Sequence, residues 1–405
     1  PHPARARAWL EGLLPEGRAR THQAVEVGVD PEDTLGFLAI YGRDTAGALV
    51  LVPAGETSVD RIGHLETVDD EEIARMLLRA AGRAGGASGR RDSLTSLPGM
   101  EPKIALALDP QGRWNRCVDG APSTHILKLS REAGSATADT IDTEAAALDL
   151  ARRIGLTTVD AHVATFGGVR AIVVSRYDRI ASSDGVTARL HQEDCAQAMG
   201  LDTRNPDRKF QFGRSLPSLL RIAQLLREGA SEPDELLRLT TFNLAIGNTD
   251  AHAKNISLLH PDDGTVSLAP AYDVAMHLHA DVPGESAMDI AGRRAMRDVT
   301  GPDLLQEAMS WGMPARRAER VVAATLDELR TALEEIDRDR HPGVRDLAWR
   351  TVEKRTQQLA DQLAPVQRAA RPQGRAHATQ PRRPKGSPRG GQFGTMHRSE
   401  PDPEP

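Results

Sequence analysis

The sequence predicts an α+β fold with two lobes, in which a mixed sheet-and-helix N-lobe precedes an all-helical C-lobe. Two observations predict this plan. Short segments rich in β-forming residues gather between residues 103 and 175, whereas helical periodicity dominates after residue 190. A smaller helical unit comes first, and the glycine-rich stretch 84–91 connects it to the sheet. The length of 405 residues is sufficient for these units and their cores.

The first unit is expected to span residues 1–85 and to be mainly helical. Apolar residues at helical spacing predict a helix at 4–14, which Pro15 and Gly17 end. Two more helices and a short strand are predicted in this unit, at 34–41, 70–81 and 47–53 respectively.

The N-lobe is expected at 86–190 and the C-lobe at 191–365. Runs of β-forming residues predict N-lobe strands at 103–108, 124–129, 162–166 and 169–175. One N-lobe helix is predicted at 142–151, because acids open it and Gly155 follows its end. Helical periodicity predicts C-lobe helices at 193–199, 216–227, 233–246, 300–310 and 316–333. Such a pair of lobes is the plan of a protein kinase, with a cleft between the lobes.

The C-terminal tail, residues 366–405, differs from the rest of the chain. From Gln362 to Ser399 there are eight Arg or Lys and no acid, with frequent Pro and Gly. This composition cannot propagate a helix or a strand, so the tail is predicted to be disordered. Contact with nucleic acid is the alternative, and a solvated extension is the favoured interpretation.

Composition narrows the class of protein. Two cysteines, Cys117 and Cys195, cannot form a disulfide framework, which fits a reducing cytoplasm. No apolar run has the length of a membrane span, and the first residues lack the apolar region of a signal peptide. The formal charge of -6 argues against a globally basic nucleic-acid surface. A cytoplasmic protein without membrane contact is expected.

The most informative motif is the segment 248–255, followed eighteen residues after Asn255 by Asp273. An Asp, an Asn five residues later and a second Asp beyond a connection form the set that phosphoryl transfer uses. Asp250 can orient a hydroxyl and accept its proton, while Asn255 and Asp273 can hold Mg²⁺ against ATP phosphates. The alternative is that these residues cap helices and stabilise turns, as Asn and Asp do in ordinary loops.

Upstream residues predict a nucleotide site. Gly99 lies in a turn just before the strand that contains Lys103, where backbone N–H groups can cover phosphates. A plain hairpin turn is the alternative. Lys128 stands within an apolar strand, so it is either a ligand of the α- and β-phosphates or a lysine on an edge strand. Glu144, about one helix away, could pair with Lys128 and fix its direction.

A transition-metal site is a competing interpretation, because four histidines lie near the two Asp residues. Their spacing matches no common zinc motif, and Asn255 would be a poor zinc ligand. The histidines are His252, His260, His277 and His279. We rank this interpretation low and expect His252 to hold the catalytic loop by hydrogen bonding.

Taken together, these segments resemble the HipA family of serine/threonine kinases, the toxin components of type II toxin-antitoxin modules. The resemblance covers residues 10–295 as an ordered series of motifs. These motifs are Gly12-Leu13-Leu14-Pro15-Glu16-Gly17, Asp44-Thr45-Ala46-Gly47-Ala48, Ser96-Leu97-Pro98-Gly99, His125-Ile126-Leu127-Lys128, Arg176-Tyr177-Asp178-Arg179, Leu190-His191-Gln192-Glu193-Asp194, the segment 246–255, and Tyr272-Asp273.

The resemblance implies a protein-kinase-like fold that uses ATP and Mg²⁺. It assigns Lys128 to the ATP phosphates, Asp250 to the base, and Asn255 with Asp273 to the metal. It also matches Ser96 to a loop serine whose autophosphorylation disrupts the ATP-binding loop and inactivates the family's kinases. The expected site also includes two residues of the catalytic loop, His252 and Lys254. The residues expected around the nucleotide are Gly99, Lys103, Glu144, Ser175 and Tyr177.

Three departures from the family pattern stand out. The chain begins about a dozen residues before the Leu13-Leu14-Pro15-Glu16 motif, where the family usually has strands, so these strands could be missing, supplied by another chain, or cut from the sequence. Ser175 replaces a common Glu at the expected adenine-binding hinge, which spares a backbone contact to adenine but removes a side-chain contact. The basic tail after residue 366 lies outside the family pattern.

The leading functional hypothesis is an ATP-dependent protein kinase that arrests growth and is restrained by a helix-turn-helix antitoxin of the HipB type. DNA contact would then occur only through the antitoxin. Characterised relatives phosphorylate aminoacyl-tRNA synthetases, so translation is the expected target by analogy. The alternatives are a kinase-fold regulatory protein with weak or no turnover, and a metal-dependent nuclease or phosphohydrolase that needs no ATP.

Overall fold

A computed structural model of the chain describes residues 2–56, 63–83, 96–130, 135, 137–181, 187–280 and 283–370. The whole glycine-rich connection predicted at 84–91, and the part of the predicted disordered tail beyond residue 370, lie outside these residues. The chain divides into two units, Pro1–Pro365 and Val366–Pro405. The site described below lies within Pro1–Pro365.

The N-terminal helices are α1 (Pro3–Glu11), α2 (Gly17–Val27) and α3 (Thr34–Tyr41). Their shared core is formed by Leu13, Leu14, Ala24, Phe37, Leu38 and Tyr41. The α2 helix was not predicted, because polar residues interrupt the apolar periodicity of its sequence. The strand predicted at 47–53 is wrong, since this segment pairs with no strand. Gly47 instead donates its backbone N–H to Asp178, 2.7 Å away, and Pro53 has no N–H to offer a sheet.

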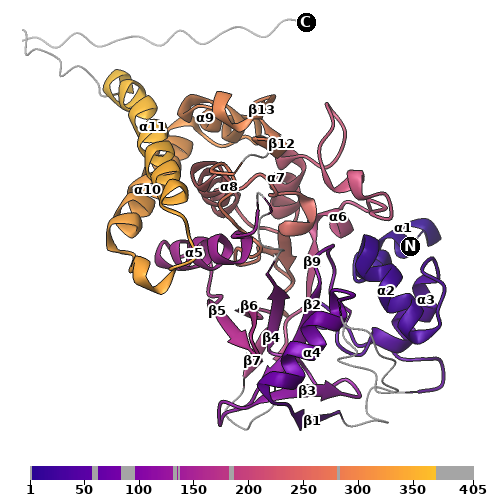
Figure 1. Cartoon of the computed structure of the whole chain (residues 1–405). Coiled ribbons are helices and arrows are strands. Elements are labelled where there is room, and N and C mark those ends of the chain that lie inside the picture. The colour runs from indigo at the N-terminus through magenta and orange to yellow at the C-terminus, as the bar shows by residue number, and fades with distance from the viewer. Residues whose placement is uncertain are drawn as a thin grey trace, which may run out of the picture. The chain divides into compact units, whose positions relative to one another are not determined.

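An antiparallel six-stranded sheet follows, with the strand order β1-β3-β2-β4-β6-β5 (Figure 1). Its strands are β1 (His64–Thr67), β2 (Lys103–Leu108), β3 (Trp114–Val118), β4 (His125–Leu129), β5 (Ala161–Phe166) and β6 (Val169–Ser175). The four predicted strands are confirmed, and β1 and β3 are additions. The register of β2 and β4 places Lys103 directly opposite Lys128.

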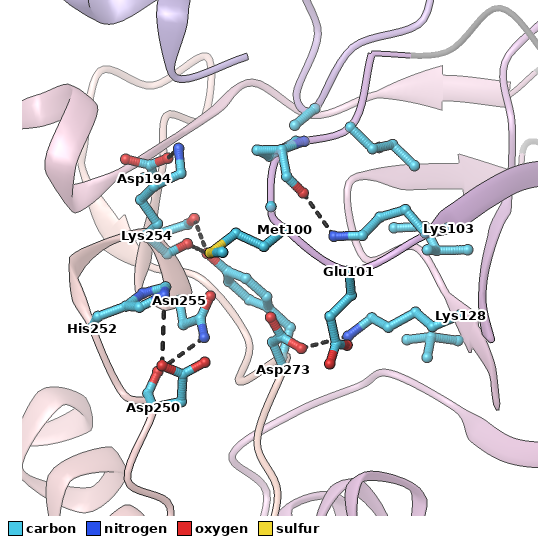
Figure 2. Close-up of a pocket in the computed structure, with 18 of the residues that line it drawn as sticks. Met100, Glu101, Lys103, Lys128, Asp194, Asp250, His252, Lys254, Asn255 and Asp273 are labelled. Carbon is cyan, nitrogen blue, oxygen red and sulfur yellow. Dashed lines mark hydrogen bonds and ion pairs between the residues drawn. The ribbon is translucent and has the colours of Figure 1, made fainter. Parts of the chain in front are cut away.

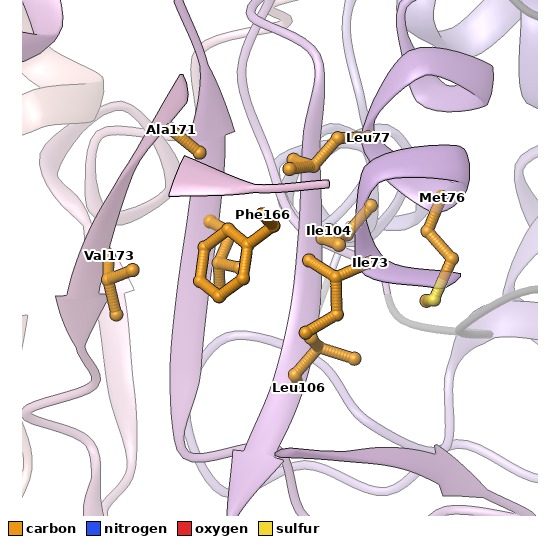
Figure 3. Close-up of a cluster of buried hydrophobic side chains, with 9 residues drawn as sticks. Ile73, Met76, Leu77, Ile104, Leu106, Phe166, Ala171 and Val173 are labelled. Carbon is orange, nitrogen blue, oxygen red and sulfur yellow. The ribbon is translucent and has the colours of Figure 1, made fainter. Parts of the chain in front are cut away.

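Two helices pack against this sheet. The α4 helix (Asp70–Ala80) starts at Asp69, whose side chain accepts from the N–H of Glu72, and three acids occupy its first turn. Its apolar face packs on the sheet, where Ile73, Met76 and Leu77 meet Ile104, Leu106, Leu127, Phe166, Ala171 and Val173 (Figure 3). The α5 helix (Thr140–Arg153) extends the predicted helix at both ends and carries Glu144.

The C-lobe contains α6 (Cys195–Ala198), α7 (Leu219–Glu228), α8 (Asp234–Ile246), α9 (Gly301–Ser310), α10 (Ala315–Glu335) and α11 (Asp346–Ala370). The five predicted helical regions each contain one of these helices, whereas α11 was not predicted. Short 3-10 helices add η1 (Pro206–Lys209), η2 (Ala253–Asn255), η3 (Met296–Asp298) and η4 (Arg338–Arg340). Within the described residues, no helix is both long and apolar enough to cross a membrane.

The description of the C-lobe as all-helical is wrong. A three-stranded sheet in the order β11-β10-β9 and a β12-β13 hairpin lie within it. These strands are β9 (Gln192–Asp194), β10 (Ser257–Leu259), β11 (Ser267–Leu268), β12 (Glu285–Ile290) and β13 (Arg293–Ala295). Most have two or three residues, which is too short for an alternating pattern to stand out from a loop. A further hairpin, β7 (Arg179–Ala181) with β8 (Thr187–Arg189), lies before the C-lobe.

Candidate active site

A cavity of about 550 Å³ is walled by the sheet, by α5 and by the loops that follow α8. Eleven of the twelve predicted site residues line it, and Ser96 does not. Figure 2 shows Asp250, Asn255 and Asp273 on one side of the cavity and Lys103 and Lys128 on the other. Residues far apart in the sequence are therefore brought together as the phosphoryl-transfer interpretation requires.

Lys128 forms the centre of the charged part of the site. Its ammonium group lies 2.7 Å from Glu144 on α5 and also contacts Asp273. Burial alone would lower the pKa of Lys128, but Asp273 and Glu144 raise it above the ordinary value. Lys128 is therefore a buried, permanently charged lysine rather than a solvent-facing residue of an edge strand.

The two carboxylates that hold Lys128 respond differently to burial. Burial raises the pKa of Glu144, and the attraction of Lys128 opposes this only in part. Burial would also raise the pKa of Asp273, yet Lys128 and then Lys103 lower it below its usual range. Asp273 is therefore ionised at neutral pH, as a metal ligand must be.

The loop 247–256, called the catalytic loop after the role predicted for it, begins where α8 ends at Gly247, which adopts a left-handed backbone with φ 74°. The loop is held by its own backbone: the N–H of His252 donates to the Asp250 carbonyl at 2.8 Å. The amide N–H₂ of Asn255 donates to the same carbonyl at 2.9 Å. This bond leaves the amide oxygen of Asn255 available to a cation.

The imidazole of His252 does not hold the loop by hydrogen bonding as expected. Among the described residues its buried Nδ1 has no hydrogen-bond partner, and its Nε2 lies 3.9 Å from Asp250. The ring instead packs edge-on against Phe210, with the ring centres 5.2 Å apart. Burial, together with the nearby Lys209, lowers the pKa of His252 to about 3, so the ring is neutral.

Asp273 has an unusual backbone. Its φ of 53° lies in the left-handed region, which Asp tolerates better than most residues but which still costs energy. The preceding Tyr272 anchors the turn, because its hydroxyl donates to the Lys254 carbonyl at 2.7 Å. A strained residue fixed by its neighbours at the edge of a cavity is typical of a functional position.

Lys254 reaches the cavity wall, but its amino group points into a buried cluster. It donates to Asp194 at 2.8 Å and to the carbonyl of Gly12 at 3.2 Å. The Gly12 contact comes from the N-terminal unit. The structure therefore places Lys254 as a link between the catalytic loop and that unit.

Ser96 lies outside the cavity. The residue is fully buried, its hydroxyl donates to the Leu13 carbonyl at 2.5 Å, and its N–H donates to the Asp44 carbonyl. Gly99, three residues later, lines the cavity with a φ of 112° that an L side chain rarely adopts. Lys103 donates to the Pro98 carbonyl at 2.7 Å, and burial followed by repulsion from Lys128 lowers its pKa.

Ser175 and Tyr177, the residues predicted to form the adenine-binding hinge, also line the cavity. The hydroxyl of Ser175 accepts a hydrogen bond from the N–H of Asp160 at 2.8 Å, and its own N–H donates to the Asp160 carbonyl. The N–H of Arg176 donates to Thr124. The backbone N–H of Tyr177, by contrast, donates to no group in the described part of the chain.

The donors around the cavity suit Mg²⁺ better than a transition metal. Among the described residues, no group of three or more His, Cys, Asp or Glu is arranged to hold a metal. Instead, His260 is within hydrogen-bond distance of Glu193, and His279 is within hydrogen-bond distance of Asp139. Asn255 and Asp273 offer hard oxygen ligands, and Mg²⁺ commonly completes its shell with water and substrate phosphates.

The sequence did not single out three charged residues of the wall, Glu16, Asp194 and Lys209. Glu16 and Asp194 lie in motifs that carry the family resemblance, which is the signal that could have found them. Lys209 follows a polar stretch and gives no such signal.

Two domains of one protein family match the chain. The HipA-like C-terminal domain matches residues 95–333, and the HipA N-terminal domain matches residues 2–52. The first match alone covers more than half of the sequence. The chain belongs to the HipA family.

Two relatives of the chain are named as kinases, and one of them is named HipA. The chain is 33% identical over 347 residues to Y4mE of Sinorhizobium fredii, which is named as a kinase, with 81% of this chain and 79% of that protein covered. It is 27% identical over 296 residues to the serine/threonine-protein kinase toxin HipA of Shewanella oneidensis, with coverage of 70% and 66%.

A solved structure of the Shewanella oneidensis HipA, in a complex with HipB and operator DNA, shares the fold. The TM-score is 0.73 at 21% sequence identity, and the likeness covers 90% of this chain and 88% of that one. The α+β fold class predicted from the sequence is thereby confirmed.

Proposed function

We propose that this HipA-family protein is an ATP- and Mg²⁺-dependent serine/threonine protein kinase. The observation that carries the proposal is the meeting of Lys128, Glu144 and Asp273 in one cavity with Asp250 and Asn255. Phosphoryl transfer requires a lysine held by a glutamate from a neighbouring helix, an Asp that can act as the base, and an Asn and an Asp that can hold a metal ion. The kinase names of Y4mE and of the Shewanella HipA support the same activity.

Each side chain has a distinct task in this proposal. The carboxylate of Asp250 orients the substrate hydroxyl and accepts its proton as the oxygen bonds to the γ-phosphorus and the bond to ADP breaks. Asn255 and Asp273 hold Mg²⁺, which when bound neutralises charge on the phosphates. Lys128 binds the α- and β-phosphates in the direction that Glu144 sets. The backbone N–H of Tyr177 is the hinge donor for adenine, and the hydroxyl of Ser175 stays with Asp160.

We propose that the kinase is the toxin of a type II toxin-antitoxin system and is restrained by a helix-turn-helix antitoxin of the HipB type. The Shewanella relative supports this, since it is named as a toxin and its structure contains HipB and operator DNA. DNA contact then runs through the antitoxin. An aminoacyl-tRNA synthetase is the proposed substrate, and inhibition of translation with growth arrest is the proposed outcome.

The proposal is tested by incubating the protein with labelled ATP, Mg²⁺ and candidate substrates, with wild type beside Asp250→Asn. Transfer of label by the wild type, and a loss of at least a hundredfold in the variant with ATP binding retained, would support the kinase mechanism. Equal transfer by both proteins would overturn it. ATP binding without transfer would favour the regulatory alternative, and hydrolysis of phosphate esters without ATP would favour the phosphohydrolase.

A further inference from the structure

Four charged side chains meet at the wall of the cavity, and each comes from a different segment. Glu16 follows α1, Asp194 ends β9, Lys209 ends η1 and Lys254 lies in η2. All four are at most 9% exposed. Lys209 lies 3.1 Å from Glu16, and Lys254 lies 2.8 Å from Asp194 and 3.7 Å from Glu16. The two positive and two negative charges balance, as a buried cluster requires.

Glu16 occupies an asymmetric position in this cluster. Its Oε2 accepts from Lys209, whereas its Oε1 is buried with no hydrogen-bond partner in the described structure. The cation facing Oε1 is Lys254. Lys254 makes its short hydrogen bonds to Asp194 and to the Gly12 carbonyl, and Glu16 faces it as a second carboxylate 3.7 Å away.

The backbone of Glu16 contacts a second part of the site. Its N–H donates to the Gly99 carbonyl at 3.0 Å, and Pro15 forms a parallel β-bridge with Gly99. Gly99 belongs to the turn that faces the cavity ahead of β2. One residue of the N-terminal domain therefore contacts the glycine turn through its main chain and the catalytic loop through its side chain.

We propose that Glu16 is a positioning residue of the kinase site, supplied by the N-terminal domain, that sets the spacing between the Gly99 turn and the loop of Asp250 and Asn255. This inference rests on the proposed kinase function. Lys254 immediately precedes Asn255 in the chain, so a shift of Lys254 displaces an amide proposed to hold Mg²⁺. The N-terminal domain then contributes to catalysis as well as to the fold.

The test is Glu16→Gln, which keeps the shape of the side chain and removes its charge. Glu26→Gln is the matched control, because Glu26 lies on α2 with a side chain that is 40% exposed. We expect Glu16→Gln to lower kcat at least tenfold and to raise the Mg²⁺ concentration for half-maximal rate at least threefold. The KM for ATP should change less than threefold, and Glu26→Gln should match the wild type.

A double-mutant cycle with Lys209→Gln separates positioning from loss of stability. Glu16→Gln leaves the cluster with one excess positive charge, and the double variant restores neutrality with Lys254 and Asp194 alone. We expect the double variant to recover at least threefold of the lost kcat. Losses that simply add, with an unchanged Mg²⁺ requirement, would indicate a merely structural role and overturn the proposal.

Hydrogen exchange gives a readout that does not depend on activity. Without nucleotide, the amides of residues 247–256 should exchange faster in Glu16→Gln than in Glu26→Gln, and equal rates would refute the positioning role. The two hypotheses fail separately. An inactive wild type refutes the kinase function. If the wild type is active and Glu16→Gln has the same kcat and Mg²⁺ requirement, only this inference is refuted.

Discussion

The ion pair between Lys128 and Glu144 offers the sharpest test of how this site is organised. Glu144→Gln keeps the size of the side chain and removes the charge that fixes Lys128. Breaking a buried pair costs about 3–5 kcal/mol when the remaining charge is left alone. Here Asp273 also contacts Lys128, so the remaining charge keeps a partner.

The expected loss is therefore that of one charge-assisted hydrogen bond, about 1.5–3 kcal/mol. At about 1.4 kcal/mol per factor of ten, this corresponds to a fall of roughly tenfold to hundredfold in kcat/KM for ATP. The pull of Asp273 on Lys128 is then unopposed, which keeps the ammonium away from the phosphates and engages a carboxylate proposed to bind metal. Both effects act in the same direction.

The assay is steady-state transfer of labelled phosphate at varied ATP, with binding of a non-hydrolysable ATP analogue measured in parallel. Glu334→Gln on α10 is the matched control, because that side chain is 66% exposed and pairs with Arg330 of the same helix. Thermal melts check that the variants are folded. A Glu144→Gln enzyme within twofold of the wild type, which is about 0.4 kcal/mol, would show that Lys128 does not depend on Glu144.

Further outcomes follow from the same geometry. Asp273→Ala should raise the Mg²⁺ concentration needed for ATP binding at least tenfold, which Mg²⁺ titrations of nucleotide affinity measure; unchanged affinity would remove Asp273 from the metal site. Ser96→Asp should weaken ATP binding, because a carboxylate buried beside the Leu13 carbonyl would move out together with its loop. In the wild type, mass spectrometry after incubation with Mg-ATP should find phosphate on the peptide that contains Ser96. An unmodified peptide from an active enzyme would contradict self-inactivation. Gly343→Ala should destabilise the protein by about 1–3 kcal/mol in denaturant melts, because the new Cβ would lie 1.9 Å from Asp142 at the start of α5; a wild-type midpoint would contradict this packing. Burial raises the pKa of Glu144, so the folded state binds the proton of Glu144 more tightly than the unfolded chain does. The stabilisation from this proton is present below pH 4.5 and is lost as the pH rises through the raised pKa. Glu144→Gln should flatten this part of the profile of unfolding free energy against pH, and an unchanged slope would be evidence against the raised pKa.

Much of the N-lobe could be predicted because its signals are local. The strands β2, β4 and β6 are short apolar runs, and in the preceding N-terminal unit the helix α3 was predicted with its observed bounds. The strand β3 escaped because Asn115 and Arg116 interrupt its apolar pattern. Both are nevertheless buried, and Arg116 is compensated by Glu72 at 2.6 Å, which is a tertiary contact that no spacing along the chain reveals.

In the candidate site too, some residues could be found from their spacing along the chain, whereas the contacts of others are set by tertiary packing. Asp250, Asn255 and Asp273 were found from spacing, because phosphoryl transfer fixes which residue types must follow one another. The burial of Ser96 depends on Leu13, 83 positions earlier, and the use of Lys254 as a link depends on Gly12, 242 positions earlier. Such pairings are set by how the N-terminal domain packs, so the sequence alone could not assign them.

The register that places Lys103 opposite Lys128 has a consequence for how the nucleotide and the sheet depend on each other. Like charges facing each other across two strands weaken the pairing of those strands. Binding of a polyphosphate between them would convert this repulsion into a shared attraction. Part of the affinity for nucleotide would then come from removing the repulsion between Lys103 and Lys128, and bound ATP would stabilise the pairing of β2 with β4.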